Sequence, residues 1–304
     1  MLPLFSVIMP AWNRAYCIKK AIQSVLNQKE QNFEIIIFDA GSRDGTAEAA
    51  RSFNDPRIRV EAWAINRGVN FARNRAIEMA RGKWMVLLDT DDELTPDAFE
   101  VAKSDFKKID KQVGLIFYGT KDVKTGKMKS FFDKKRGEIS YEDWLGEKNL
   151  RGEFLPIARR EVFAKEMFPE NIIGFEKYFW LIVAQHYKVI IHNTAIRLYD
   201  PRGENRASKY ILKEEYAAPR AKSYKLFLKR YGEDMKRVNP KLYAHYLSVM
   251  GHLFCLAGMK QEGKAAIREA SQYDFGFKIG GVYLMSFLGK WPFRLASRIV
   301  ARFS

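Results

Sequence analysis

Short apolar runs alternate with segments of helical periodicity over about the first hundred residues. A helix that presents one face to a core has apolar residues at i, i+3, i+4, i+7 and i+8, a spacing followed by Ile18, Ala21, Ile22, Val25 and Leu26. The pattern predicts strands at 5–10, 33–39, 57–64 and 83–89, and helices at 18–26, 46–53 and 69–80. Strands that alternate with helices predict an α/β fold with a mostly parallel sheet and helices on both faces.

Beyond Leu94 the sequence "TPDAFEVA" predicts a helix start with Thr95 as the N-cap. Between 106 and 205, "VGLIFYG" and "KVIIHNTAIRLYD" are typical of strands, and "FEKYFWLIVAQH" is typical of an apolar-faced helix. From about residue 206 the pattern becomes helical, and 246–274 predicts a helical hairpin with Gly258 at its turn. We therefore expect one domain over 1–205 and a helical region over 206–304.

Composition limits the class of protein. With 304 residues, of which 47% are apolar, the chain can bury a large core. Cys17 and Cys255 are far apart in the sequence, which predicts neither a disulfide framework nor a thiolate metal site and favours a reducing, cytoplasmic setting. The first residues lack a basic leader, and no run approaches the roughly 20 apolar residues of a membrane-spanning helix.

The net charge of +16 is concentrated in one part of the chain. Residues 201–304 contain 20 lysines and arginines against 8 acidic residues, which suggests an anionic partner. The last segment, "WPFRLASRIVARFS", places Arg294, Arg298 and Arg302 four residues apart beside an apolar stripe. Such a helix either lies on an anionic membrane surface or packs on the protein's own core, and the charge excess favours the membrane. No nucleic-acid partner is expected, because the aromatic residues form no stacking platform.

Polar side chains follow each of the first four predicted strands. They are Asn13, Asp39, Asn66 and Asp89. In a parallel sheet the carboxyl ends of the strands share one edge, where loops and helix N-termini converge and ligands bind. The sequence therefore predicts a binding site at this edge.

Three carboxylates occur within "VLLDTDDEL", directly after an apolar run: Asp89, Asp91 and Asp92. Acidic residues often cap helices or solvate loops, but Thr95 is already the predicted cap. Carboxylates two positions apart can share a hard divalent cation, which in proteins commonly also binds substrate phosphates. The cluster therefore favours a site for Mn²⁺ or Mg²⁺.

Four segments in order, "VIMPAWNR", "IIIFDAGSRDGT", "NRGVNFARN" and "VLLDTDDEL", resemble the signature of glycosyltransferase family 2. The resemblance is strong over 4–95 and weak over 96–205. It implies the GT-A fold, a nucleotide-sugar donor and inverting, metal-dependent transfer. Within a domain of 1–205 it implies a nucleotide-sugar half at 1–95 and an acceptor half at 96–205.

The resemblance also implies roles for single residues on the donor side. The backbone at Ala11, Trp12 and Asn13 would line the nucleotide pocket, and Asp39 would pair with the base, typically uracil. A turn-forming role for Asp39 is the alternative.

Further along, the resemblance places Asn66 and Gly68 near the sugar and Arg73 near the diphosphate. Asp89 and Asp91 match the two acids of the DxD motif, with Asp91 toward the metal and Asp89 toward the metal or the ribose. Ala40 departs from the family pattern, which usually has a second aspartate at this position.

For the catalytic base, the resemblance aligns Trp180 with a tryptophan that follows a Glu-Asp pair in relatives. Glu176 then stands where the aspartate would be and is the predicted base, with Asp200 as the reserve candidate. The alternative role of Glu176 is an ion pair with Lys177 or a nearby arginine. Tyr199 occupies the place of a histidine that completes the site in relatives, and 202–206 supplies two arginines that could neutralise the diphosphate.

The predicted enzyme is a hexosyltransferase that moves a sugar from a nucleoside-diphosphate donor, UDP-linked by expectation, to a hydroxyl of a glycan or lipid-linked acceptor. Cell-surface polysaccharide synthesis at the inner face of the cell membrane is the expected setting. The alternative is a non-catalytic nucleotide-sugar or glycan-binding protein on the same fold. A nucleotidyltransferase that makes sugar nucleotides would be expected to have a glycine-rich, basic phosphate loop after the first strand. The segment there, "PAWNR", contains no glycine, which disfavours this class.

Overall fold

The structure, a computed structural model, describes residues 2–148, 150–200 and 213–274. Its chain divides into two compact units, the first formed by Met1–Glu170 and Phe179–Glu204 and the second by Asn171–Tyr178 and Asn205–Ser304. The short segment Asn171–Tyr178 therefore belongs with the C-terminal helices, although the residues on both sides of it belong to the first unit.

The first unit contains a nine-stranded sheet in its described residues, in the order β3-β2-β1-β4-β10-β6-β11-β5 with β8 paired to β11. Its strands are β1 (Phe5–Ala11), β2 (Phe33–Ala40), β3 (Ile58–Trp63), β4 (Trp84–Leu87), β5 (Asp92–Leu94), β6 (Val113–Asp122), β8 (Arg136–Ile139), β10 (Leu155–Arg159) and β11 (Lys188–Tyr199). A separate two-stranded sheet pairs β7 (Ser130–Phe132) with β9 (Leu150–Gly152). The helices are α1 (Ile18–Leu26), α2 (Thr46–Arg51), α3 (Val69–Met79), α4 (Ala98–Phe106), α5 (Tyr141–Leu145), the 3-10 turn η1 (Arg160–Ala164) and α6 (Glu176–His186), whose first residues lie in the second unit.

The first four strands pair in parallel, as do β6 and β11, whereas β10 runs antiparallel between β4 and β6. The prediction of a mostly parallel α/β sheet is confirmed. The strands β5 and β10 were not predicted, because three and five residues are too few to show a periodicity.

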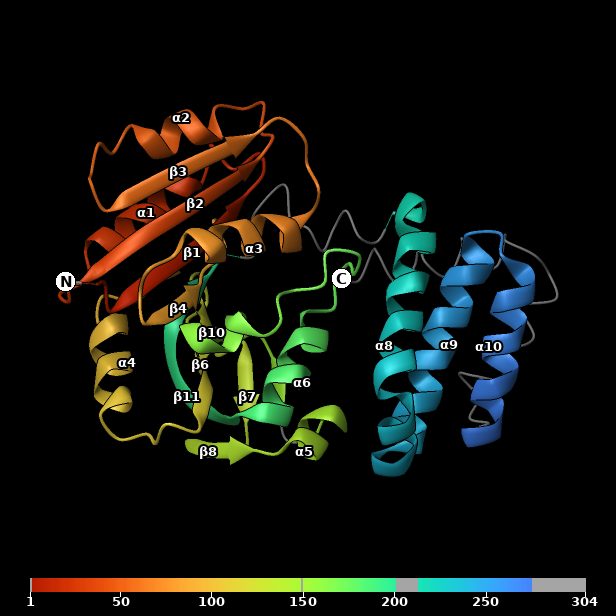
Figure 1. The fold of residues 1–304 in the computed structure, drawn as a ribbon. Helices are drawn as coiled ribbons and strands as arrows, with labels where there is room; N and C mark the ends of the chain where they lie inside the picture. The colour runs from red at the N-terminus through yellow and green to blue at the C-terminus, as the bar shows by residue number, and fades with distance from the viewer. Residues whose placement is uncertain (1, 149, 201–212, 275–304) are drawn as a thin grey trace. The chain divides into compact units, whose positions relative to one another are not determined.

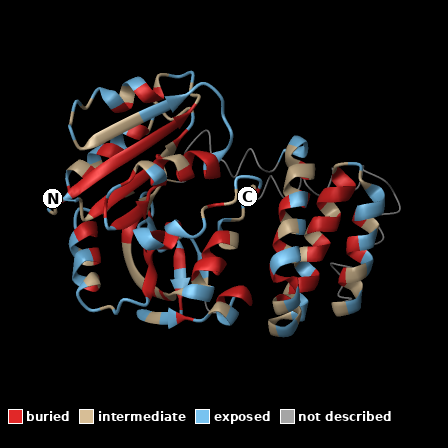
Figure 2. Ribbon diagram, in the orientation of Figure 1, coloured by how far each residue is buried: buried red, intermediate tan, exposed pale blue. Residues whose placement is uncertain are grey.

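Helices cover both faces of this sheet, as Figure 1 shows for α1 and α3. On one face Phe5 of β1 stacks on Phe99 of α4, with 4.2 Å between ring centroids. On the other face Phe38 of β2 meets Phe71 of α3 edge to face at 5.9 Å. All eight residues of β2 are buried, as are all four of β4, and Figure 2 shows these buried strands between partly exposed helices. Strands buried on both faces account for their continuous apolar sequences.

Glu34 is a buried acid inside this apolar strand layer, with 2% of its surface exposed. Its carboxylate accepts hydrogen bonds from the Ser6 hydroxyl at 2.7 Å and from the backbone N–H groups of Arg81 at 2.6 Å and Gly82 at 3.2 Å. Burial raises the pKa of Glu34, but these hydrogen bonds and the Arg81 charge outweigh burial and lower the pKa. The acid thereby ties the start of β4 to β1 and β2.

The start of α4 differs from the prediction. The helix begins at Ala98 after Asp97, and Thr95 is not its N-cap. The backbone N–H of Thr95 donates instead to the Ile196 carbonyl at 2.9 Å, and its hydroxyl donates to Asp97 at 2.7 Å. This hydrogen bond to β11 holds Thr95 beside the end of β5, and the helix begins two residues later than predicted.

The second unit contains the 3-10 turn η2 (Glu214–Tyr216) and the helices α8 (Ala217–Val238), α9 (Pro240–Leu256) and α10 (Lys260–Tyr273). The predicted helical hairpin is present, with Gly258 at a φ of +87° between α9 and α10. Phe175 packs on Tyr224 and Phe227 of α8, with ring centroids 4.4 and 5.3 Å apart. This packing explains why the segment before α6 belongs to the helical unit.

Among the described residues, no helix combines the length and the apolar character that crossing a bilayer requires. The predicted basic helix with Arg294, Arg298 and Arg302 lies outside the described residues, as do Arg202 and Arg206. Their roles stay predictions.

Candidate functional site

The carboxyl ends of β1, β2 and β4 form the edge that the sequence singled out. β1 lies between the other two strands in parallel register, with Ala11 of β1 opposite Asp39 of β2. Asn13 and Asp89 follow the ends of their strands by two residues each. The fold therefore collects polar side chains that are far apart in sequence.

A hydrogen-bond chain joins the loops that follow β1 and β2. The backbone N–H of Asn13 donates to the Ser42 hydroxyl at 2.7 Å, and Ser42 donates through its own N–H and hydroxyl to Oδ1 of Asp39. Oδ1 of Asn13 accepts from the Arg43 N–H at 3.0 Å, with Asn13 at a φ of +52°. Asp39 is 3% exposed, and because its bonds to described residues end on Oδ1, Oδ2 can accept from another donor.

A second contact fixes the same two loops. Oδ2 of Asp44 accepts from the Ala15 N–H at 3.0 Å, and its Oδ1 accepts from the Thr46 N–H at 3.1 Å. Burial raises the pKa of Asp44, but these hydrogen bonds outweigh burial and lower the pKa. Gly41, at a φ of +78°, lies where an added Cβ would come within 2.9 Å of the Ala64 carbonyl oxygen. The loop that carries Asp39 is therefore held on both sides.

The three aspartates after β4 form a compact acidic cluster. Asp89, Asp91 and Asp92 each offer a carboxylate oxygen, and these oxygens lie within 4.8 Å of one another. A turn brings them together, since the Asp92 N–H donates to the Asp89 carbonyl at 3.1 Å. Two carboxylates about 5 Å apart repel by roughly 3 kcal/mol at an effective dielectric constant of about 20. An all-oxygen set at this spacing fits a hard divalent cation, which would offset that repulsion.

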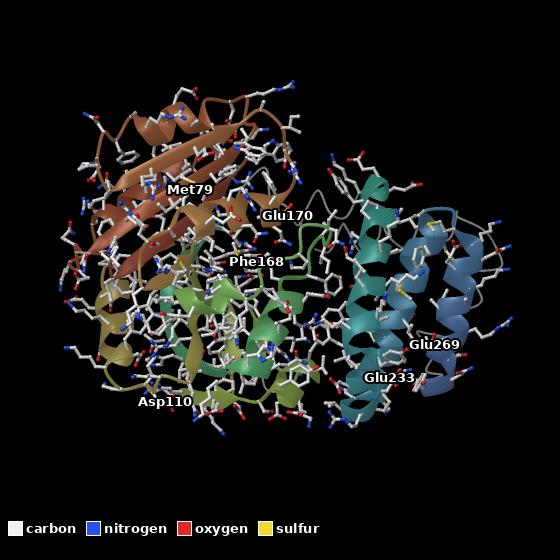
Figure 3. All side chains as sticks on the ribbon, in the orientation of Figure 1. Met79, Asp110, Phe168, Glu170, Glu233 and Glu269 are labelled. Atoms are coloured by element: carbon white, nitrogen blue, oxygen red, sulfur yellow. The ribbon has the colours of Figure 1, made fainter. Side chains whose placement is uncertain are left out.

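Arg73 of α3 borders the cluster on one side. Its guanidinium is 4% exposed, and Nη2 lies 3.6 Å from Oδ1 of Asp89. Asn70 accepts from Nη1 at 3.4 Å, and the guanidinium lies 4.9 Å from the centre of the Phe168 ring. Phe168 and Glu170 lie beside α3 in Figure 3. Asn74 of α3 donates to the Phe168 carbonyl at 2.8 Å.

Arg197 of β11 borders the cluster on the other side. It is 4% exposed, with Nε 3.4 Å from Oδ2 of Asp92 and Nη2 3.3 Å from the largely exposed Glu153. Burial lowers the pKa of Arg197, but the charges of Asp92, Asp89 and Glu153 outweigh burial and raise the pKa. A buried arginine therefore borders the cluster at two of its three acids, Arg197 at Asp92 and Arg73 at Asp89.

The start of α1 also lies near the cluster. Gln28, which follows the other end of α1, donates to the Thr95 carbonyl at 2.7 Å and accepts from the Phe99 N–H at 3.1 Å, which fixes the chain after the aspartates. Burial raises the pKa of the Cys17 thiol to about 11, and the charge of Asp91 adds to this rise.

Comparison with known sequences identifies the family. A sequence model described as Glycosyl transferase family 2 matches residues 6–165, which is more than half of the chain. The chain belongs to glycosyl transferase family 2. A curated relative from Campylobacter jejuni, GalNAc(5)-diNAcBac-PP-undecaprenol beta-1,3-glucosyltransferase, is 28% identical over 65% of this chain and 65% of its own length. The chain therefore spans slightly less than two thirds of that relative.

Solved structures share the fold of this family 2 chain. S. aureus TarS in complex with UDP-GlcNAc has a TM-score of 0.61 at 17% identity, covering 97% of this chain and 92% of that chain. The mannosyltransferase PcManGT from Pyrobaculum calidifontis, in complex with GDP-Man and Mn²⁺, has a TM-score of 0.56 at 18% identity, covering 100% and 87%. The GT-A fold prediction is confirmed.

Other residues that the sequence singled out lie around this edge of the family 2 fold. Oδ1 of Asn66 accepts from the N–H of Gly68 at 2.7 Å, and Gly68 precedes α3 at a φ of +93°. Trp12 is 36% exposed, whereas Ala11 and Ala40 are buried. Their roles toward the nucleotide and the sugar stay predictions.

The acceptor-side residues of the family 2 chain are divided between the units. Tyr199, at the end of β11, pairs in register with Asp92 of β5, so it lies next to the acidic cluster. Asp200 follows it and is half-buried. Glu176 is exposed at the first position of α6 and belongs to the second unit, so its role as the base stays a prediction.

Arg197, which is buried beside the acidic cluster, is the site residue that the sequence analysis missed. No local pattern distinguishes it in "AIRLYD", because its importance depends on β5 pairing with β11. A buried arginine on a strand is detectable only once that pairing is known.

Proposed function

We propose that this family 2 chain is a metal-dependent, inverting glycosyltransferase that uses a UDP-sugar donor. The observation that carries the proposal is the acidic cluster, whose oxygens lie within 4.8 Å of one another at the carboxyl edge of the sheet. Arg73 beside the cluster adds a buried cation suited to a diphosphate. This combination supports a site for a divalent cation together with a nucleoside diphosphate.

In this proposal Asp91 and Asp89 hold Mn²⁺ or Mg²⁺, which supplies charge neutralisation for the leaving diphosphate when bound. Asp39 accepts the imide N–H of uracil through Oδ2, and the backbone of Ala11 to Asn13 lines the nucleotide pocket. The loop contacts of Asp39 favour this role, because they fix the carboxylate without using Oδ2. Arg73 attracts the diphosphate.

Glu176 is the proposed general base. Its carboxylate takes the proton from an acceptor hydroxyl as that oxygen bonds to the anomeric carbon and the bond to the nucleoside diphosphate breaks. A single displacement inverts the configuration of the sugar. Exposure at the first position of α6 leaves the carboxylate accessible to an acceptor.

The proposed acceptor is a glycan or lipid-linked saccharide, in cell-surface polysaccharide synthesis at the inner face of the cell membrane. The name of the Campylobacter relative, which describes an undecaprenol-linked acceptor, supports this choice. The net charge of +16 is compatible with an anionic surface nearby.

The first test is a thermal-shift panel of UDP, GDP, ADP and CDP, each with and without Mn²⁺. At about 100 times its Kd a ligand stabilises the folded state by roughly 2.7 kcal/mol, which for a chain of 304 residues corresponds to a rise of about 4 °C in melting temperature. We expect this rise for UDP with Mn²⁺, and a much smaller one for Asp91→Asn. Asp133→Asn, which changes an exposed acid elsewhere in the first unit, is the matched control. An unchanged manganese-dependent rise in Asp91→Asn would remove the proposed metal site.

The second test separates an enzyme from a non-catalytic sugar-nucleotide-binding protein. Wild type should release UDP from UDP-sugars in the presence of Mn²⁺, and Glu176→Gln should lower turnover by about 10²–10⁴-fold with donor affinity unchanged. Glu161→Gln, an exposed acid in the same region of sequence, should retain turnover. Donor binding without any release of UDP would favour the non-catalytic alternative.

A further inference from the structure

The turn between β6 and β7 exposes apolar side chains away from the donor-side loops. Val123, Met128 and Phe131 are 40%, 41% and 55% exposed. The other large apolar side chains of comparable exposure among the described residues are at the N-terminus or in the donor-side loops and strand ends: Leu2, Trp12, Tyr16, Trp63, Ile65 and Val69. Water contact with three such side chains is unfavourable, so their exposure calls for a partner that covers them.

The same turn is strongly basic. Residues 121–129 contain one acid, Asp122, and four exposed lysines, which are Lys121, Lys124, Lys127 and Lys129. The Asp122 carboxylate is buried and accepts the N–H groups of Lys124 at 3.0 Å and Thr125 at 2.9 Å. The Asp122 carboxylate is thus bound within the turn, and the charges that the turn exposes to solvent are positive.

The turn is preformed. Lys121 and Met128 pair across a β-bridge, and the Gly126 N–H donates to the Asp122 carbonyl at 2.9 Å with Gly126 at a φ of +66°. Because Lys121 and Met128 are opposite each other in this bridge, their side chains lie on the same face of the hairpin. One basic and one apolar side chain therefore share a face of a preformed hairpin, and further exposed basic and apolar side chains surround them.

The hairpin also lies near the acidic cluster. It leaves β6 at Asp122, which pairs with Tyr199 of β11, and Tyr199 pairs on its other side with Asp92 of β5. Asp122 and Asp92 are therefore two strand spacings apart, a distance of about 10 Å between their backbones. A surface that binds the hairpin would thus lie close to the proposed catalytic edge.

We propose that the hairpin of residues 121–131 docks on the surface of an anionic lipid bilayer. The lysines pair with anionic headgroups, and the apolar side chains enter the interface between headgroups and acyl chains. A soluble polyanion would use the lysines but would leave Val123, Met128 and Phe131 in water, so the combination favours lipid. The proposal is independent of the donor chemistry.

The test is flotation of the full chain with vesicles of phosphatidylcholine alone or mixed with phosphatidylglycerol. Each lysine near an anionic leaflet strengthens binding about fivefold, so the triple variant Lys121→Gln, Lys124→Gln, Lys127→Gln should bind on the order of 100-fold more weakly. Val123→Ser with Phe131→Ser should also weaken binding while preserving the charge.

The matched control removes three exposed lysines elsewhere in the first unit: Lys107→Gln, Lys108→Gln and Lys111→Gln. It should float like wild type. Equal flotation of the control and the hairpin triple variant would overturn the proposal. So would loss of binding in the triple variant with no loss in Val123→Ser, Phe131→Ser, because that result indicates a soluble polyanion.

A local readout separates the hairpin from the rest of the chain. A polarity-sensitive fluorophore on Met128→Cys should shift to shorter wavelength with anionic vesicles, whereas one on Lys108→Cys should not. The raised thiol pKa values of Cys17 and Cys255, both caused mainly by burial, make selective labelling feasible at neutral pH. A chain that floats without a shift at position 128 would refute docking by the hairpin. Asp91→Asn should float like wild type whether or not the proposed donor site is correct, because this change leaves the hairpin unaltered.

Discussion

Replacing Arg197 with methionine removes the guanidinium whose Nε lies 3.4 Å from the buried Asp92 carboxylate. At this separation and an effective dielectric constant of about 20, their attraction is roughly 5 kcal/mol. The burial of both groups offsets part of it, and removal of one partner from a buried pair generally costs about 3–5 kcal/mol. We therefore expect Arg197→Met to lower the free energy of unfolding by about 3–4 kcal/mol.

The assay is urea unfolding of the full chain in a double-mutant cycle. Asp92→Asn alone should cost a similar amount, and the double variant should cost at least about 2 kcal/mol less than the sum of the two single changes. Glu153→Gln is the control, because that partner of Arg197 is 60% exposed and its loss should cost under about 1 kcal/mol. Additive single changes, within about 0.5 kcal/mol, would refute the pairing.

Three further predictions concern stability. Glu34 has a lowered pKa, so its contribution to the free energy of unfolding is present above the unfolded pKa and is lost as pH falls through the folded pKa. Glu34→Gln should therefore lower the free energy of unfolding by about 2 kcal/mol at pH 7 and by much less in acid. Equal losses at both pH values in urea unfolding would contradict this. Burial, with the nearby Arg220 charge, lowers the pKa of His252 to about 4. As pH falls below about 6.5, this histidine therefore binds a proton in the unfolded chain before it does in the folded chain. The free energy of unfolding should fall by up to about 3 kcal/mol between pH 6.5 and pH 4. His252→Gln should reduce the pH dependence of the unfolding free energy in this range, and an unchanged slope would argue against a half-buried neutral histidine. Gly41→Ala should cost about 2 kcal/mol, since φ is +78° and the space is closed by a carbonyl oxygen; a thermal melt identical to wild type would show that the loop relaxes freely.

The sequence predicted the elements whose patterns are long enough to be periodic. The helix at Ile18–Leu26 was predicted from its apolar spacing, and β2 was predicted because an uninterrupted apolar run indicates a strand buried on both faces. The predicted start of α4 was wrong because the backbone N–H of Thr95 donates a hydrogen bond to the carbonyl of Ile196, more than 90 residues away in sequence. Local cap preference cannot compete with a strand pairing that the local sequence does not reveal.

The candidate site divides in the same way. Asp39 and Asp89 could be assigned to one edge from sequence, because strand ends in a parallel sheet share that edge whatever their separation along the chain. The sequence alone thus determined the family signature, the layered α/β architecture and the acids at the carboxyl edge. Only the tertiary structure decided which buried arginine lies beside each acid, since the contact between Arg197 and Asp92 depends on the register of β11 against β5. That register is set by packing across the whole sheet, and electrostatic pairing at a few ångströms is therefore a property of the fold and not of any local segment.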